Sequence, residues 1–199
     1  ASNLVTLSGF LSFRGIDVVM KVIKDQPDQI RSTVDTLLRE CDAILTIGGA
    51  WEGDKDYSLG VLDELGWEPH FHRVRIGPGK AVAFGLLQGK PVFCLPGGPP
   101  SNEMAFLQIA FPAIVAMSGY PSTPLATVKA ILQEEVGGQK SWTQFIYAEL
   151  GENNGHVTVK PLVSQSRLKN MAGATSIIKI PEGERVLLKD SWIDVQVLV

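Results

Sequence analysis

Hydrophobic and polar positions follow two different rhythms along this chain, one before and one after residue 120. The first part contains four stretches that are predicted as helices: 2–13, 25–41, 57–65 and 101–117. Between them lie short apolar runs that predict strands: 17–23, 43–47 and 70–76. Pro27 suits a first helical turn, and Pro112 should kink or interrupt the last helix because it has no N–H.

A hairpin is predicted between residues 81 and 96. The runs "AVAFGLL" and "PVFCLP" are separated by Gln88-Gly89-Lys90, and a glycine-containing turn of this length joins antiparallel strands. The wider alternation of helices and strands nevertheless predicts a mostly parallel sheet that helices cover on both faces.

The pattern changes at "GYPSTPL" (119–125), where two prolines and a glycine indicate a linker. Beyond it, helical periodicity is nearly absent and five short strands are predicted: 126–132, 145–150, 157–161, 177–180 and 192–199. This spacing favours a small β-barrel or sandwich. We therefore expect two domains, 1–120 and 121–199, divided near Pro121.

Composition excludes several classes of protein. The 199 residues are 45% hydrophobic, enough for a sizeable core, and the net charge of −3 gives no electrostatic footprint for nucleic acid. No apolar stretch is long enough to span a membrane, and the first residues do not resemble a signal peptide. Cys41 and Cys94 lie in apolar contexts and are expected to be buried free thiols of a cytoplasmic protein.

Candidate chemistry lies in three glycine-bearing bends: "GGAWEGDKDYS" (48–58), "GPGKA" (77–81) and "LPGGPPS" (95–101). In open α/β sheets, ligands bind beyond the carboxyl ends of the strands, where glycine lets the backbone approach a phosphate. Lys80 would add a point charge for an anion. The alternative is that the first and last bends are tight strand-to-helix turns.

Acidic and aromatic residues of the first bend leave two interpretations each. Asp54 and Asp56 could hold Mg²⁺ together with substrate oxygens, or Asp54 could cap the helix that follows. Trp51 could stack on a flat heterocycle or cover the core. His70 and His72 share one face of a predicted strand, but no third ligand is near them, so a polar strand face is favoured over a metal site.

The motifs "LTIGGAWEGDKDYSLGVLDELG", "RVRIGPGKAVAFG" and "FCLPGGPPS", in this order and spacing, resemble the molybdenum insertases, the molybdopterin molybdenumtransferase family that includes the gephyrin E domain. The resemblance continues through "QSRLKNMAGATSIIKIPEG" (165–183) and covers essentially the whole chain. It implies an α/β fold: a three-layer molybdopterin-binding domain lacking its first strand, followed by a small all-β, barrel-like domain. The molybdopterin adenylyltransferases share the first domain but lack the β part.

The resemblance implies insertion of molybdate into adenylylated molybdopterin, with Mg²⁺ and release of AMP. It assigns catalytic roles to Asp54, Asp56 and Lys80, with Asp56 also holding the metal. It assigns substrate binding to Gly48, Gly49, Arg73, Pro96, Gly97, Pro99, Ser101, Ser166 and Arg167. It further implies a homodimer with a pterin substrate, without nucleic acid or membrane, and leaves open a contact with molybdopterin adenylyltransferase.

The chain departs from the family pattern at four positions. Trp51 replaces a small hydroxyl residue, Gly77 a lysine, Ala81 a proline and Gly98 an asparagine. The resemblance also begins after the family's first strand and its Thr-Gly-Asp-like motif, and the two N-terminal domains have no counterpart. We therefore expect an excised fragment or a shortened paralogue, with an unpaired sheet edge or strand exchange between subunits.

Three functions are compatible with these observations. The first is the insertase function, with weak or no catalysis by this chain alone, and with molybdate or tungstate as the oxyanion. The second is a non-catalytic pterin-binding or scaffold paralogue. The third is molybdopterin adenylyltransferase activity, against which the β part argues.

Overall fold

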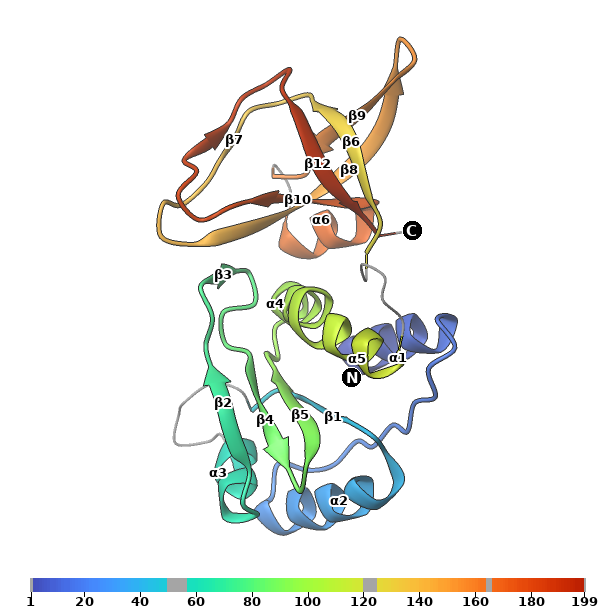
Figure 1. Ribbon diagram of the computed structural model, residues 1–199, viewed down its shortest axis with the longest axis vertical. Coiled ribbons are helices and arrows are strands. Elements are labelled where there is room, and N and C mark those ends of the chain that lie inside the picture. The colour runs from blue at the N-terminus through green and yellow to red at the C-terminus, as the bar shows by residue number, and fades with distance from the viewer. Residues whose placement is uncertain (1, 50–56, 120–124, 164–165, 199) are drawn as a thin grey trace. The chain divides into compact units, whose positions relative to one another are not determined.

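The computed structural model describes residues 2–49, 57–119, 125–163 and 166–198, and the statements below concern these ranges. The chain divides into two compact units (Figure 1). Unit 1 comprises residues 1–74 and 79–117, and unit 2 comprises 75–78 and 118–199. The predicted boundary near Pro121 lies outside the described residues. In the described ranges, no helix combines the length and apolar character that a membrane crossing requires.

Unit 1 is built on a four-stranded sheet with the strand order β1-β5-β4-β2. The strands are β1 (Ile44–Ile47), β2 (Glu68–His72), β4 (Ala83–Leu87) and β5 (Lys90–Leu95). Only the β1–β5 pair is parallel, because the hairpin at Gln88-Gly89 connects β4 directly to β5 and β2 pairs antiparallel with β4. The hairpin prediction is confirmed, and the prediction of a mostly parallel sheet is wrong.

Residues 17–23, predicted as a strand, form no strand in the structure. A strand needs a partner, and residues 17–23 pair with none of the described strands, although β1 pairs only with β5 and keeps its other edge open. The segment crosses the gap between two helices with its larger apolar side chains exposed: Val19, Met20, Val22 and Ile23. The predicted strand at 70–76 is likewise shorter and ends at His72, because Arg73 turns the backbone with φ +69°.

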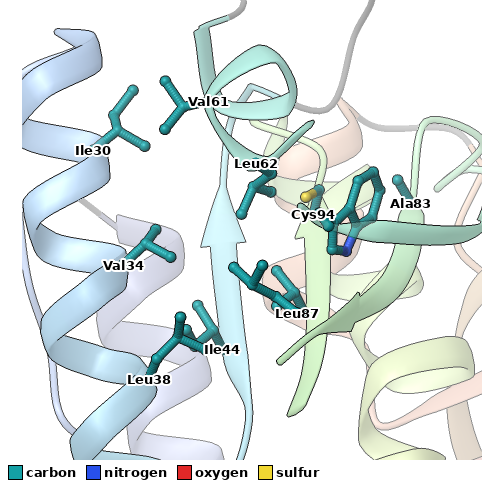
Figure 2. Close-up of a cluster of buried hydrophobic side chains, with 11 residues drawn as sticks. Ile30, Val34, Leu38, Ile44, Val61, Leu62, Ala83, Leu87 and Cys94 are labelled. Atoms are coloured by element: carbon teal, nitrogen blue, oxygen red, sulfur yellow. The ribbon is translucent and has the colours of Figure 1, made fainter. Parts of the chain in front are cut away.

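Two helices cover one face of this sheet. α2 (Pro27–Glu40) starts with Pro27 in its first turn, as predicted, and α3 (Tyr57–Glu64) follows the first glycine bend. Figure 2 shows Val34 and Leu38 of α2 projecting toward Ile44 of β1. These residues belong to one buried cluster that also includes Leu62 of α3. The apolar side chains at helical spacing in α2 therefore form the face that packs on the sheet.

The opposite face is covered by α1 (Ser2–Phe13), α4 (Pro99–Ala105) and α5 (Phe111–Met117), so unit 1 has three layers (Figure 1). The ring of Phe10 in α1 packs edge-on against Phe106 and Phe111, with centroids 5.5 and 5.0 Å away. Between α4 and α5 lies a π-helical turn, η1 (Phe106–Ala110). Pro112 follows it directly and has no N–H to continue an α-helical ladder, which accounts for the predicted interruption.

Unit 2 is a closed five-stranded β-barrel. Its strands are β6 (Thr127–Leu132), β8 (Thr143–Asn153), β9 (His156–Pro161), β10 (Ser176–Ile180) and β12 (Trp192–Val197). They pair in the order β10-β12-β6-β9-β8, and a further pairing of β10 with β8 closes the ring. Closure leaves no open edge among these five strands and encloses an apolar core that includes Leu132, Ile178 and Val195. The five predicted strands are thus confirmed.

Three short elements complete unit 2. β3 (Ile76–Gly77) adds to β8, and β7 (Val136–Gly137) pairs with β11 (Val186–Leu187). The helix α6 (Arg167–Gly173) was not predicted, because its seven residues carry too few apolar positions to show a helical period.

Candidate functional site

The register of the sheet in unit 1 places the predicted bends at one end of it. Ile47, the last residue of β1, pairs with Leu95, the last residue of β5. The next residues along each strand, Gly48 and Pro96, therefore leave the sheet side by side. Ala83 at the start of β4 pairs with Cys94, and His72 at the end of β2 pairs with Ala83. Arg73 and Lys80 consequently lie at the same end of the sheet.

The first and last bends approach each other closely. A Cβ atom added to Gly97 would lie 3.7 Å from the Cα atom of Gly48. Gly48 and Gly49 have φ angles of +88° and +77°, a region that residues with a side chain rarely adopt. The N–H of Gly48 also donates to the carbonyl oxygen of Leu95 at 3.0 Å, which ties the start of the first bend to β5.

A cavity of about 560 Å³ opens beside these bends, a volume in the range of small-molecule sites. Gly48, Gly49, Gly97 and Pro99 line it on the side of the bends. β1, the extended segment before α2, α2 itself and the start of α3 form the other walls, which carry the following polar residues: Lys21, Lys24, Asp25, Thr33, Thr46 and Ser58. The cavity wall therefore combines the ammonium groups of two lysines with glycine backbone that no side chain covers.

Thr46 is a candidate that sequence reasoning missed. Its Oγ1 atom is buried and has no hydrogen-bond partner within the described residues. Buried hydroxyl groups are normally satisfied, so a water molecule or a ligand in the cavity is the expected partner. The signal in the sequence was a single hydroxyl residue in the apolar run "AILTI", which also fits an ordinary strand.

Two side-chain amides hold the last bend. The Nδ2 atom of Asn102 donates to the carbonyl oxygen of Pro96 at 2.8 Å, and that of Asn3 donates to the carbonyl oxygen of Gly97 at 2.9 Å. Asn102 is 2% exposed, so its amide is committed to this bond. Both asparagines were missed as site residues, because a tertiary contact from α1 to residue 97 leaves no periodic signal.

The other predicted site residues of unit 1 do not line the cavity. Lys80 and Arg73 are exposed. The segment between Arg73 and Lys80 forms a loop, and the Val74 N–H donates to the carbonyl oxygen of Lys80 across it at 3.0 Å. Ser101 is half-buried in the first turn of α4.

The predicted metal site cannot be built from the residues that the structure describes. Asp54, Asp56 and Trp51 lie outside them. Within the described ranges no three histidine, cysteine, aspartate or glutamate side chains gather as metal ligands. The assignment of Mg²⁺ to Asp56 therefore stays a prediction.

Ser166 and Arg167 belong to unit 2. The Oγ atom of Ser166 accepts a hydrogen bond from the Lys169 N–H at 3.4 Å, so Ser166 is the N-cap of α6. Arg167 is the first residue of this helix and is exposed. A structural role is thus visible for Ser166, and the predicted anion contacts of both residues stay predictions.

Comparison with protein families gives one match, to the family described as "Probable molybdopterin binding domain", over residues 2–116. Among curated proteins, the chain is 28% identical over 187 residues to the molybdenum cofactor synthesis protein cinnamon of Drosophila melanogaster, covering 90% of this chain and 31% of that protein. It is 26% identical over 184 residues to a molybdopterin molybdenumtransferase of Staphylococcus aureus, covering 91% of this chain and 44% of that protein. The chain thus spans less than half the length of these relatives.

The fold is similar to that of a solved protein. The structure of the molybdopterin biosynthesis MoeA protein of Pyrococcus horikoshii superposes with a TM-score of 0.80 at 24% identity. The match covers 98% of this chain and 47% of that one, so it includes both the α/β unit and the barrel.

Proposed function

We propose a function for this chain on the premise that it belongs to the molybdopterin-binding domain family, whose profile matches residues 2–116. Molybdenum cofactor biosynthesis is therefore the process in which it takes part. The finer proposal is that the chain carries the pterin- and oxyanion-binding part of a molybdenum insertase. That enzyme inserts molybdate into adenylylated molybdopterin and releases AMP.

One observation supports this proposal most directly: the close approach of Gly48 and Gly97 beside a ligand-sized cavity. Glycine leaves the backbone uncovered, so N–H groups that are not already bonded, as that of Gly48 is to Leu95 O, are accessible to phosphate oxygens. Lys21 and Lys24 at the cavity wall outnumber the one carboxylate there, that of Asp25, and the remaining positive charge attracts an anionic substrate. A phosphorylated pterin combines a flat ring with such anionic groups.

In the proposed reaction water attacks the phosphoanhydride of the adenylylated pterin, and AMP and the pterin phosphate separate. Molybdate then binds the two dithiolene sulfurs, and one of its oxygens leaves as water with the two thiol protons. Lys80, Arg73 and Ser101 would supply charged and hydroxyl donors to the oxyanion from the same end of the sheet. Asp54 and Asp56 are proposed for the hydrolytic step. Mg²⁺, when bound, would polarise the phosphoanhydride.

The substrate-binding roles of Ser166 and Arg167, which belong to unit 2, stay predictions. The homodimer, the cytoplasmic location and the contact with molybdopterin adenylyltransferase stay predictions, because they depend on the longer relatives.

A second candidate is pterin binding without turnover. Gly77 and Gly98 offer no side chain at positions where the resembled family has a lysine and an asparagine. An anion pocket with fewer donors binds its transition state less tightly than a complete one. This candidate therefore predicts that the substrate binds and that AMP is not released.

The test measures both steps on the purified chain. Binding of adenylylated molybdopterin is followed by isothermal titration calorimetry, and AMP release is followed by chromatography with and without molybdate. Because this chain alone is expected to turn over weakly or not at all, the same two measurements are made on the complete open reading frame. Molybdate-dependent AMP release by either protein supports the insertase, and binding without release by both supports the second candidate. The absence of any binding would overturn both, and Glu134→Gln on the barrel surface serves as a control for nonspecific effects.

A further inference from the structure

We propose that Asn102 is a positioning residue, which orients the backbone N–H group of Gly97 toward a tetrahedral oxyanion, beside the N–H group of Gly98 that Asn3 holds. The proposal rests on the proposed function, because it assigns a role to one part of that site. It adds a residue that acts through the backbone and does not itself touch the ligand.

All three successive carbonyl groups of this bend accept hydrogen bonds. The Asn102 side chain donates to Pro96 O at 2.8 Å, and its backbone N–H donates to Gly98 O at 2.8 Å. The carbonyl oxygen between them, on Gly97, accepts from the Asn3 amide at 2.9 Å. Asn102 thus fixes the first and last of the three peptide groups, and Asn3 fixes the middle one.

Fixing the carbonyl groups also fixes the N–H groups. The bonds joining residues 96 to 99 are not among the cis peptides of the described chain, and in a planar trans peptide the N–H points opposite to the C=O. The N–H of Gly97 is therefore directed away from Asn102, and that of Gly98 away from Asn3. The next residue, Pro99, has no N–H to place.

Neither of these two donors finds an acceptor in the part of the chain that the structure describes. Gly97 and Gly98 are both exposed, and Gly97 lines the cavity. Two backbone donors held in fixed directions suit the oxygens of molybdate or of a phosphate group. An unrestrained glycine pair would lose conformational freedom on binding and would bind more weakly.

The side chain at position 102 must be a donor for this arrangement. Alanine would leave the carbonyl of Pro96 without its partner, and aspartate would place a carboxylate against that carbonyl oxygen. Serine keeps a donor on a shorter side chain. The three substitutions therefore separate the presence of a donor from its reach and charge.

The experiment uses ¹⁵N-labelled full chain with sodium molybdate and inorganic phosphate as probes. Nuclear magnetic resonance is expected to show the amide signals of Gly97 and Gly98 shifting as molybdate is added. Calorimetry is expected to show about tenfold weaker molybdate binding for Asn102→Ala and Asn102→Asp, because charge-assisted hydrogen bonds lose their alignment. Measurements are made at a temperature where circular dichroism shows each variant folded.

Lys90→Met is the matched control, since it removes hydrogen bonds to carbonyl groups of unit 1 far from the bend in sequence. It should lower stability and leave molybdate affinity unchanged, whereas a purely structural Asn102 would behave in the same way as this control. Unchanged affinity in folded Asn102→Ala, or in Asn102→Asp, would overturn the proposal. If both variants unfold, the titration of the unmodified chain still tests the proposal. Amide signals of Gly97 and Gly98 that do not shift in molybdate-bound protein would overturn the proposal.

The failure of the proposed function gives a different result. Adenylylated molybdopterin would then not bind, while molybdate or phosphate would still move the two glycine signals in an Asn102-dependent way. Conversely, pterin binding and AMP release without these shifts would retain the proposed function and reject the role of Asn102.

Discussion

The Nζ atom of Lys90 lies 2.7 Å from the carbonyl oxygen of Cys41, the C-cap residue that follows α2. The same ammonium group donates to the carbonyl oxygen of Leu38 at 2.7 Å. Carbonyl groups in the last turn of a helix have no intrahelical donors, and a cation also interacts favourably with that end of the helix. Lys90 therefore fastens the first residue of β5 to the helix that covers the sheet.

Replacing Lys90 by methionine keeps most of the side-chain stem and removes the charged donor. We expect the free energy of unfolding to fall by about 1.5–3 kcal/mol, as for hydrogen bonds that involve a charged group. Urea denaturation followed by circular dichroism measures the change. Lys21→Met, on the exposed segment before α2, should change stability by less than about 0.5 kcal/mol. Equal effects of the two substitutions would refute the role given to Lys90.

Gly85 in β4 is expected to tolerate no side chain. A Cβ atom there would lie 2.3 Å from the carbonyl oxygen of Glu68 and 2.6 Å from the side chain of Trp67. Gly85→Ala should therefore destabilise the chain by about 1–3 kcal/mol or more through overpacking.

The matched control for this substitution is Gly60→Ala in α3, where the added atom meets nothing within 4 Å. There alanine should stabilise the helix by about 0.5–1 kcal/mol, since glycine is a poor helix former. Thermal unfolding of both variants checks the pair. A neutral result for Gly85→Ala would mean that β2 and β4 separate more easily than their register suggests.

Thr46→Val separates a structural hydroxyl group from one that binds ligand. Because the Oγ1 atom is buried without a partner in the described chain, valine should leave the stability of the free protein unchanged or raise it by up to about 1 kcal/mol. If the hydroxyl contacts the substrate, binding of adenylylated molybdopterin should weaken several-fold. Calorimetry measures the affinity, and urea denaturation measures the free energy of unfolding. A loss of stability above about 1 kcal/mol would show that the hydroxyl group already has a partner in the free protein.

Ser166 can be tested as a cap and as an anion contact with two substitutions. Ser166→Ala should cost about 0.5–1 kcal/mol, because the 3.4 Å bond to the Lys169 N–H is long for a cap. Ser166→Asp should restore stability, since aspartate also caps helices, while its negative charge should weaken molybdate binding if Ser166 contacts the anion. Unaltered molybdate affinity in both variants would reduce Ser166 to its role in α6.

The sequence predicted elements better than their pairing. The five strands of the barrel follow from short apolar runs between turn residues, but the β10–β8 pairing that closes the barrel joins segments whose contact no local pattern encodes. In unit 1, the helix–strand alternation suggested parallel strands, although the hairpin at Gln88-Gly89 was visible and required an antiparallel pair. The glycine-containing turn therefore predicted the pairing of these strands correctly, and the alternation of helices and strands did not.

The site was predictable where glycine and charge carry the chemistry. The bends at 48–49 and 96–98 meet, as expected from strands that end at one edge of a sheet. Asn3 and Asn102 could not be found in this way, because their roles depend on hydrogen bonds to a distant or irregular backbone. The residues with predicted acid and metal roles, Asp54 and Asp56, lie outside the described residues.

The unpaired side of β1 has a practical consequence for anyone who purifies this chain. Of the described strands, only β5 borders β1, and the apolar residues of 17–23 lie on the cavity side without a strand to cover them. Such an edge is a template on which any extended polypeptide can add itself, including one from a neighbouring molecule. Low protein concentration and short storage will therefore favour the monomer, whereas high concentration will favour association through the open edge of β1.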